Sequence, residues 1–248
     1  MHSPDIFIVH GALGCADQME RVADALSALG IVQVVELPGH GSTPLRDGER
    51  FDFDAFTGAL SSAIERRAKS VREEVMRLHA RVDPPLPIVF GYSMGGYAVL
   101  ALEAKHPSSF GGIVTLGTKF AWTPEYADRE KSRLDAAAIA EKVPKYAMQL
   151  EERHAACGGW HSVLDNTATM LTRLGTTPLL TREVLAHVRV PVCLAVGDLD
   201  DMVTIDETRE TASWLSNGTA VVLPGVPHPI DRVPVDRVVE LVRNFTNM

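Results

Sequence analysis

The sequence predicts an α/β fold built on a minimal, mainly parallel sheet of about six strands. Short runs rich in Val, Ile and Leu recur along the chain and are mostly apolar at consecutive positions, which is typical of strands buried on both faces. Helical patterns alternate with these runs, as in sheets covered by helices on both sides. One long interval has no convincing strand and predicts an inserted helical segment.

The elements of the core are expected in residues 1-118 and 188-248. Strands are expected at residues 6–9, 31–37, 87–92, 112–116, 190–196 and 219–223. Helices are expected near residues 16–29, 53–81, 94–105, 206–215 and 235–245. With 248 residues, 46% of them hydrophobic, one domain can bury a substantial core.

Residues 119-187 form the interval without strands, where helix-like segments are expected at 127–142, 145–157 and 161–174. We interpret the interval as a helical cap inserted into the core. Its Trp122, Tyr126 and Trp160, together with Leu13 from the core, are the candidates for contact with a substrate. Packing within the cap is the alternative that the pattern favours for any single residue, since aromatic side chains usually pack.

Composition excludes several classes of partner. The formal charge of -8 is spread over the chain, whereas nucleic-acid binding needs a clustered basic face. Three scattered cysteines do not make a disulfide framework. No apolar run reaches the roughly 18 residues that a membrane-spanning helix requires, and no secretory signal is visible at the start of the sequence. We therefore expect a cytoplasmic protein that acts on a small molecule, and a homodimer remains open.

The strongest local signal is GYSMGG at residues 91–96, which follows an apolar run and precedes a helical pattern. This strand, turn and helix order is what a nucleophile elbow requires. Ser93 would sit on a strained turn, and glycine at positions 91 and 95 removes side chains that would collide there. The helix that follows points its N-terminus at the site, so the Met94 N–H can stabilise an oxyanion.

The chain resembles the α/β-hydrolase superfamily, because other signatures follow in the expected order. HGALG at residues 10–14 is similar to the H-G-x-x-G loop, which implies that the backbone N–H of Ala12 completes the oxyanion hole. PGHGS at residues 38–42 is similar to a structural loop of the superfamily, so His40 is a poor candidate for the base. The superfamily often opens with an antiparallel hairpin, whereas this chain enters its first strand by about Asp5, so an all-parallel sheet is expected.

The acid and the base follow from the same resemblance. Residues 197–203, GDLDDMV, resemble the G-x-x-D-x-x-V segment that delivers the acid, and counting from Gly197 selects Asp200. Asp198 is the runner-up, because an error of one turn in the loop register would exchange the two. His228 is the one histidine of nine in a loop after the final strand, and the order nucleophile, acid, base is that of this fold.

These features predict a serine hydrolase that cleaves a carboxylic ester with an apolar acyl group through an acyl-enzyme on Ser93, His228 and Asp200. The pattern His154-x-x-Cys157-x-x-x-His161 lacks a fourth ligand for a closed metal site, so neither a metal nor a cofactor is expected.

Two alternatives stay open. The elbow also resembles those of the menaquinone-pathway synthase and of meta-cleavage-product hydrolases, which implies carbon–carbon cleavage or elimination on the same triad. An Arg-rich pocket would favour that chemistry, and the inserted interval contains Arg129, Arg133, Arg153 and Arg173. The other alternative is a receptor that binds a small ligand without turnover, because fold alone does not define function.

Overall fold

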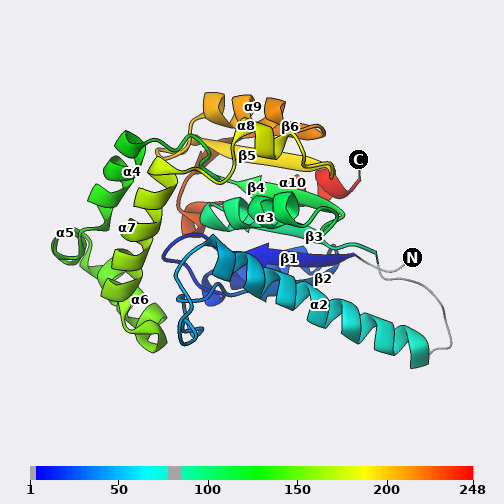
Figure 1. Ribbon diagram of the computed structural model, residues 1–248, viewed down its shortest axis with the longest axis horizontal. Helices are drawn as coiled ribbons and strands as arrows, with labels where there is room; N and C mark the ends of the chain where they lie inside the picture. The colour runs from blue at the N-terminus through cyan, green and yellow to red at the C-terminus, as the bar shows by residue number, and fades with distance from the viewer. Residues whose placement is uncertain (1–3, 78–84, 248) are drawn as a thin grey trace.

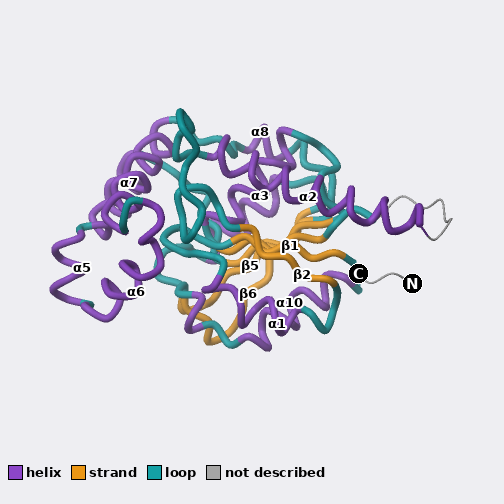
Figure 2. Tube along the Cα trace, turned by 90° about the horizontal axis from the view of Figure 1, so that it is seen from below, coloured by secondary structure: helices purple, strands orange, loops and turns teal. Residues whose placement is uncertain are grey.

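A computed structural model describes residues 4–77 and 85–247 and shows one sheet between two layers of helices (Figure 1, Figure 2). The strands are β1 (Asp5–Val9), β2 (Ile31–Val35), β3 (Ile88–Tyr92), β4 (Gly112–Leu116), β5 (Val192–Leu199) and β6 (Gly218–Pro227). Their order in the sheet is β2-β1-β3-β4-β5-β6, and each neighbouring pair is parallel. This confirms the predicted sheet of about six parallel strands.

Helices cover both faces of the sheet. One face carries α2 (Phe53–Arg77), α3 (Met94–Lys105), α8 (Arg182–Leu185) and α9 (Ile205–Trp214), and the other carries α1 (Glu20–Leu26) and α10 (Val235–Thr246). Figure 2 shows α2, α3 and α8 on one side of the strands and α1 and α10 on the opposite side. Two short 3-10 helices, at Asp17–Met19 and Ile230–Arg232, belong to the same core. Residues 78–81 of the expected helix 53–81 lie outside the described residues.

The interval between β4 and β5 contains helices and no strand. Before α8, which packs on the sheet, its elements are α4 (Pro124–Lys131), a 3-10 turn at Ser132–Leu134, α5 (Ala136–Lys142), α6 (Pro144–His154), a second 3-10 turn at Ala155–Cys157 and α7 (Trp160–Thr176). Local sequence defines several of these starts: the Thr123 and Asp135 side chains accept N–H bonds as N-caps. In Figure 1 α4, α5, α6 and α7 stand together beyond the carboxyl ends of the strands.

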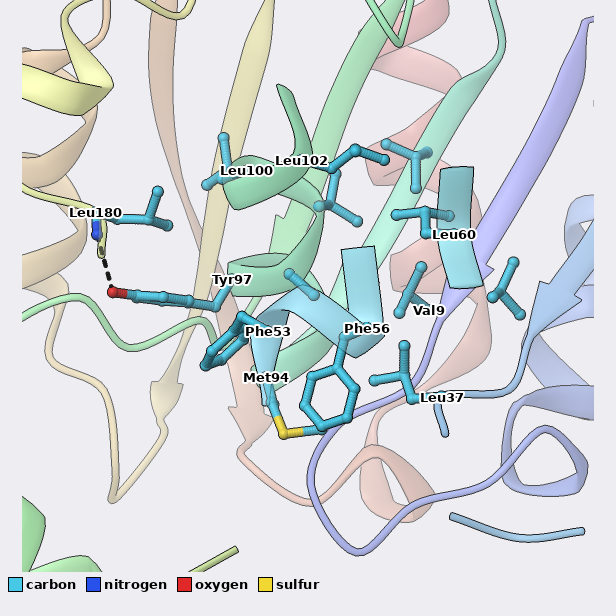
Figure 3. Close-up of a cluster of buried hydrophobic side chains, with 14 of the residues drawn as sticks. Val9, Leu37, Phe53, Phe56, Leu60, Met94, Tyr97, Leu100, Leu102 and Leu180 are labelled. Carbon is cyan, nitrogen blue, oxygen red and sulfur yellow. Dashed lines mark hydrogen bonds between the residues drawn. The ribbon is translucent and has the colours of Figure 1, made fainter. Parts of the chain in front are cut away.

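The apolar core lies in two layers, one on each face of the sheet. Figure 3 shows part of the larger layer, where Phe53 and Phe56 of α2 meet Met94 and Tyr97 of α3. Burial of each such side chain stabilises the fold by roughly 1.5–3 kcal/mol. The Tyr97 hydroxyl accepts the backbone N–H of Leu180 at 3.0 Å, which ties α3 to the segment after α7.

Among the described residues, none of the helices combines the length and the apolar character needed to cross a lipid bilayer.

Candidate active site

The turn between β3 and α3 holds Ser93 in a strained conformation, with φ 51° and ψ −118°. Such a backbone costs on the order of 1–3 kcal/mol and persists only where its surroundings fix it. Here the Ser93 N–H donates to the Leu116 carbonyl at 2.9 Å, and the Thr118 hydroxyl donates to the Ser93 carbonyl at 3.0 Å. The end of β4 therefore holds the elbow in place.

Glycine at positions 91 and 95 makes this turn sterically feasible. A Cβ on Gly91 would lie 2.5 Å from Cα of Gly96, and a Cβ on Gly95 would lie 2.5 Å from the His10 carbonyl oxygen. Both contacts are with backbone atoms, so no side-chain rotation relieves them. The predicted steric purpose of the two glycines matches these positions.

Ser93, His228 and Asp200 come together at the carboxyl ends of β3, β5 and β6. Ser93 Oγ lies 3.2 Å from His228 Nε2, and His228 Nδ1 lies 2.8 Å from Asp200 Oδ2. The side chains of His228 and Asp200 are 9% and 2% exposed. Asp200 Oδ1 accepts the N–H groups of Met202 and Val203, each at 2.9 Å. The carboxylate is therefore fixed, and it can hold the imidazole with Nε2 facing the serine.

The neighbouring carboxylates have other contacts. Asp198 Oδ1 accepts the Gly225 N–H at 2.6 Å and so links β5 to β6. Asp201 is 71% exposed and lies 3.4 Å from Arg133. His40 is fully buried beside Phe51 and does not reach the serine. Of the three aspartates, Asp200 is the one in contact with His228.

The Leu13 N–H has no acceptor among the described residues, and neither do the N–H groups of the two predicted donors, Ala12 and Met94. Both residues line the same cavity as Ser93 and His228. Met94 begins α3, so its N–H points out of the N-terminus of a twelve-residue helix. A pair of such donors can stabilise a negatively charged oxygen that develops beside Ser93.

The cavity above Ser93 has a volume of about 980 Å³ and reaches under α4, α5, α6 and α7. Of the four candidates for contact with a substrate, Leu13 and Trp122 line it. Tyr126 and Trp160 do not. Tyr126 instead packs against the Lys119 ammonium, 3.9 Å from its ring centroid, and Trp160 is 5% exposed in the apolar core. Both side chains therefore pack within the protein and do not face the cavity, because an aromatic residue of an inserted helix can belong to the apolar core of the insertion.

Gln149 lines the cavity without any signal in the sequence, whereas Arg153 is one of the four arginines of the insertion considered above for an Arg-rich pocket. Tyr146, Gln149 and Arg153 all lie on α6 and line the cavity. Their spacing of three and four residues places them on one helix face, but that signal gains meaning only once the orientation of α6 is known. Burial raises the pKa of the Tyr146 hydroxyl, and the positive charge of Arg153 opposes that rise.

The residues of the His154-Cys157-His161 pattern contact different partners. His154 Nδ1 accepts the Gly41 N–H at 3.0 Å, so its Nε2–H donates to the Leu13 carbonyl at 3.1 Å. The Cys157 thiol donates to the Gly41 carbonyl, and the His161 ring contacts the Trp160 ring at a tilt of 45°. Within the described ranges, no group of three or more His, Cys, Asp or Glu side chains is arranged to hold a metal ion.

Known proteins resemble this chain over most or part of its length. Residues 2–230 match the family model described as serine aminopeptidase, S33. A pimeloyl-[acyl-carrier protein] methyl ester esterase of Chromobacterium violaceum is 25% identical over 247 residues, covering 91% of this chain and 87% of that protein. An esterase of the same description from Aromatoleum aromaticum is 28% identical over 130 residues, 51% of this chain and 43% of the relative.

Solved structures share the fold. NosK from Streptomyces actuosus superposes with a TM-score of 0.75 at 22% identity, over 99% of this chain and 98% of that one. A thermophilic esterase from Thermogutta terrifontis gives a TM-score of 0.72 at 17% identity, over 99% and 90% of the two chains. At these identities the likeness concerns the architecture.

Proposed function

The chain belongs to the serine aminopeptidase S33 family of α/β-hydrolases, and on that premise we propose that it hydrolyses a carboxylic ester through an acyl-enzyme on Ser93. The observation that carries the proposal is the continuous contact from Ser93 Oγ through the His228 ring to Asp200, at 3.2 and 2.8 Å. The proposal is also supported by the description of the Chromobacterium violaceum relative as a methyl ester esterase.

In this mechanism His228 Nε2 takes the Ser93 proton as Oγ attacks the ester carbonyl. The carbonyl oxygen becomes an oxyanion and accepts the N–H groups of Ala12 and Met94. Collapse of the intermediate breaks the bond to the alcohol, which leaves with the proton from His228. Water activated by the same imidazole then releases the acid and restores the serine hydroxyl. Throughout, Asp200 holds the Nδ1–H and stabilises the imidazolium.

An ester is a better match to the cavity than the N-terminus of a peptide. An aminopeptidase must bind the free ammonium of its substrate, which calls for acidic side chains. Six cationic side chains line this cavity against two anionic ones, Glu130 and Asp231. Because like charges repel more strongly where water is excluded, this lining opposes a cationic substrate.

We further propose that residues 119–187 act as a cap that selects the acyl group, with residues 1–118 and 188–248 as the catalytic core. The cap helices supply much of the cavity wall, and Leu13, Met170, Leu171 and Leu174 give that wall apolar surface. Buried Lys119 and Glu207 form a 3.0 Å ion pair where the insertion leaves the core. This anchor holds the base of the cap close to the site.

A matched ester series tests the proposal. Hydrolysis of p-nitrophenyl esters from acetate to decanoate would be compared between wild type and Ser93→Ala. Turnover that disappears in the variant, with an unchanged melting temperature, supports a serine esterase, and the preferred chain length measures the pocket. Turnover that survives Ser93→Ala, or none above background at any length, overturns it; tight ligand binding without turnover would instead indicate a receptor.

Carbon–carbon bond hydrolysis on the same three residues is a second candidate, because the cationic lining suits an anionic substrate of that kind. Ultraviolet assays with vinylogous 1,5-diketone acids discriminate the two reactions. The second candidate predicts that their turnover exceeds that of esters and is also lost in Ser93→Ala.

A further inference from the structure

Three polar side chains form a row along the inner face of α6. Tyr146, Gln149 and Arg153 are spaced i, i+3 and i+7, so they project from the same side of the helix. All three line the cavity that contains Ser93 and His228. Between them they make one hydrogen bond within the described part of the chain, from Arg153 to the Leu13 carbonyl. The row therefore offers hydrogen-bond donors that the fold does not use.

Arg153 has the largest unused capacity. Its guanidinium carries five N–H donors in a planar fork, and only Nη1 is engaged, with the Leu13 carbonyl at 2.9 Å. No carboxylate of the described residues lies within 4.0 Å of it, although the chain contains 32 Asp and Glu residues. A half-buried guanidinium without an acidic partner can take a bidentate carboxylate in its remaining fork.

The charges of the cavity point the same way. Its cationic lining residues are Lys119, Arg133, Lys142, Lys145, Arg153 and Arg232. The cavity thus has more cationic than anionic side chains, although the protein as a whole has a formal charge of -8. Lys119 is neutralised by Glu207, and Arg133 by Glu130 and Asp201. Arg153 differs from these two because it is held in place by a backbone carbonyl, which positions its charge without cancelling it.

We propose that Tyr146, Gln149 and Arg153 form a subsite for a carboxylate at the far end of the acyl group, so that the preferred substrate is a half-ester of a dicarboxylic acid. The proposal rests on the ester hydrolysis proposed above and specifies its substrate class. The guanidinium donates two parallel hydrogen bonds to the carboxylate, and the phenol and amide add neutral ones.

The position of Arg153 sets the geometry of such a substrate. Its anchor, Leu13, directly follows Ala12, whose N–H is the proposed donor to the oxyanion, so the guanidinium on α6 is held against the loop that binds the ester end of the acid component. Apolar wall residues, among them Leu13 and Met170, lie in the same cavity. A short methylene chain that carries an ester at one end and a carboxylate at the other suits this arrangement.

The test compares charged and neutral esters of equal length. Monomethyl succinate, glutarate, adipate and pimelate would be assayed by proton release beside methyl butyrate, pentanoate, hexanoate and heptanoate. The subsite predicts a clear optimum among the half-esters and a higher kcat/KM than for the neutral ester of that length. Arg153→Met is expected to lower kcat/KM for the best half-ester by roughly 10- to 100-fold, mainly through KM. The loss for the neutral ester of equal length is expected to be clearly smaller, because that substrate loses only the support that Arg153 gives to the Leu13 carbonyl.

Two further variants control for folding and for general charge. Arg153→Lys keeps the charge without the fork and is expected to recover part of the loss. Arg173→Met, on the exposed side of α7 and outside the cavity lining, is expected to behave as wild type. Equal losses on charged and neutral esters in Arg153→Met, or no preference for half-esters in wild type, overturn the subsite.

A binding measurement separates this inference from the proposed function. If no ester is hydrolysed, glutarate, adipate and pimelate would be titrated into the Ser93→Ala protein by calorimetry. Binding that disappears on the further change Arg153→Met supports the carboxylate subsite even though the esterase proposal fails. No binding of any diacid in that experiment overturns the subsite as well.

Discussion

The Tyr92 hydroxyl donates a 2.8 Å hydrogen bond to the backbone carbonyl of His228. Tyr92 is the last residue of β3, directly before Ser93, and His228 lies in the loop after β6. Their rings are also in contact, with centroids 5.6 Å apart. A single side chain thus couples the turn that carries the serine to the loop that carries the histidine, although two strands, β4 and β5, lie between β3 and β6 in the sheet.

Replacement of Tyr92 by Phe tests Tyr92 as a positioning residue. The change removes the hydroxyl and leaves the His228 carbonyl unpaired, which costs roughly 1–3 kcal/mol. We expect kcat to fall by about tenfold with KM nearly unchanged, measured well below the melting temperature. Tyr97→Phe is the comparison, because it removes a buried hydroxyl that accepts two N–H groups outside the Ser93–His228 contact. A loss of stability without a loss of kcat in Tyr92→Phe would assign Tyr92 a purely structural role.

The choice of acid can be tested with two aspartates of the same segment. Asp200→Asn keeps the acceptor for the Met202 and Val203 N–H groups but removes the charge that stabilises the imidazolium, so kcat should fall by about three to four orders of magnitude. Asp198→Asn alters only the bond to Gly225, and activity within about twofold of wild type is expected. Steady-state kinetics of the two variants decide the question, and the opposite ranking would reassign the acid to Asp198.

The geometry around Ser93 was predictable because it depends on local sequence. A strand, a glycine-flanked turn and a helix fix the elbow within about ten residues, and the structure has the β3, Ser93 and α3 arrangement that GYSMGG indicates. The roles of Asp200 and His228 could also be predicted, because parallel strands bring their carboxyl ends to one edge of the sheet. The chain order of the three residues then left few alternatives.

The other contacts depend on how distant segments pack, and sequence patterns do not encode that directly. Trp160 and Tyr126 carry the same aromatic signal as Trp122, yet only Trp122 reaches the cavity. The strand β6 extends to Pro227, past the predicted end at residue 223, since an edge strand tolerates Pro224 and Gly225. The helix α8, with four residues, is too short to show a helical period.

Substitution by alanine is predicted to have opposite effects on stability at Gly95 and at Gly58. Gly95→Ala would place a Cβ against the carbonyls of Val9 and His10, so the elbow must shift. We expect activity to fall at least 100-fold and the free energy of unfolding to drop by about 3 kcal/mol. At Gly58, in the second turn of α2, a Cβ meets nothing within 4 Å, and alanine should stabilise the protein by roughly 0.5–1 kcal/mol. Urea unfolding of both variants checks this, and a fully active Gly95→Ala protein would contradict the close approach.

Three buried histidines join the loop after β1, the loop after β2 and helix α6. The His40 ring lies 5.1 Å from that of His10 and 6.0 Å from that of His154. His10 Nε2 accepts the Leu37 N–H at 3.0 Å, and His154 Nδ1 accepts the Gly41 N–H at 3.0 Å. A ring nitrogen that accepts a hydrogen bond carries no proton, so the His10 and His154 rings are neutral in these contacts. Burial lowers the pKa of His10 to about 4 and also lowers the pKa values of His40 and His154.

These pKa shifts predict that acid weakens the packing of α6 against the loops after β1 and β2. A histidine whose pKa is depressed in the folded state binds its proton more readily when unfolded, so its stabilisation is complete above pH 6.5 and is lost as pH falls toward 4. For His10 alone the loss amounts to about 3 kcal/mol over that window. The free energy of unfolding from urea titrations should therefore fall steadily between pH 6.5 and 4. His154→Gln should flatten this dependence whatever its effect at neutral pH, whereas the exposed His106→Gln should leave the slope unchanged. If wild type were equally stable at pH 7 and pH 4.5, the three rings could not be held neutral by the fold.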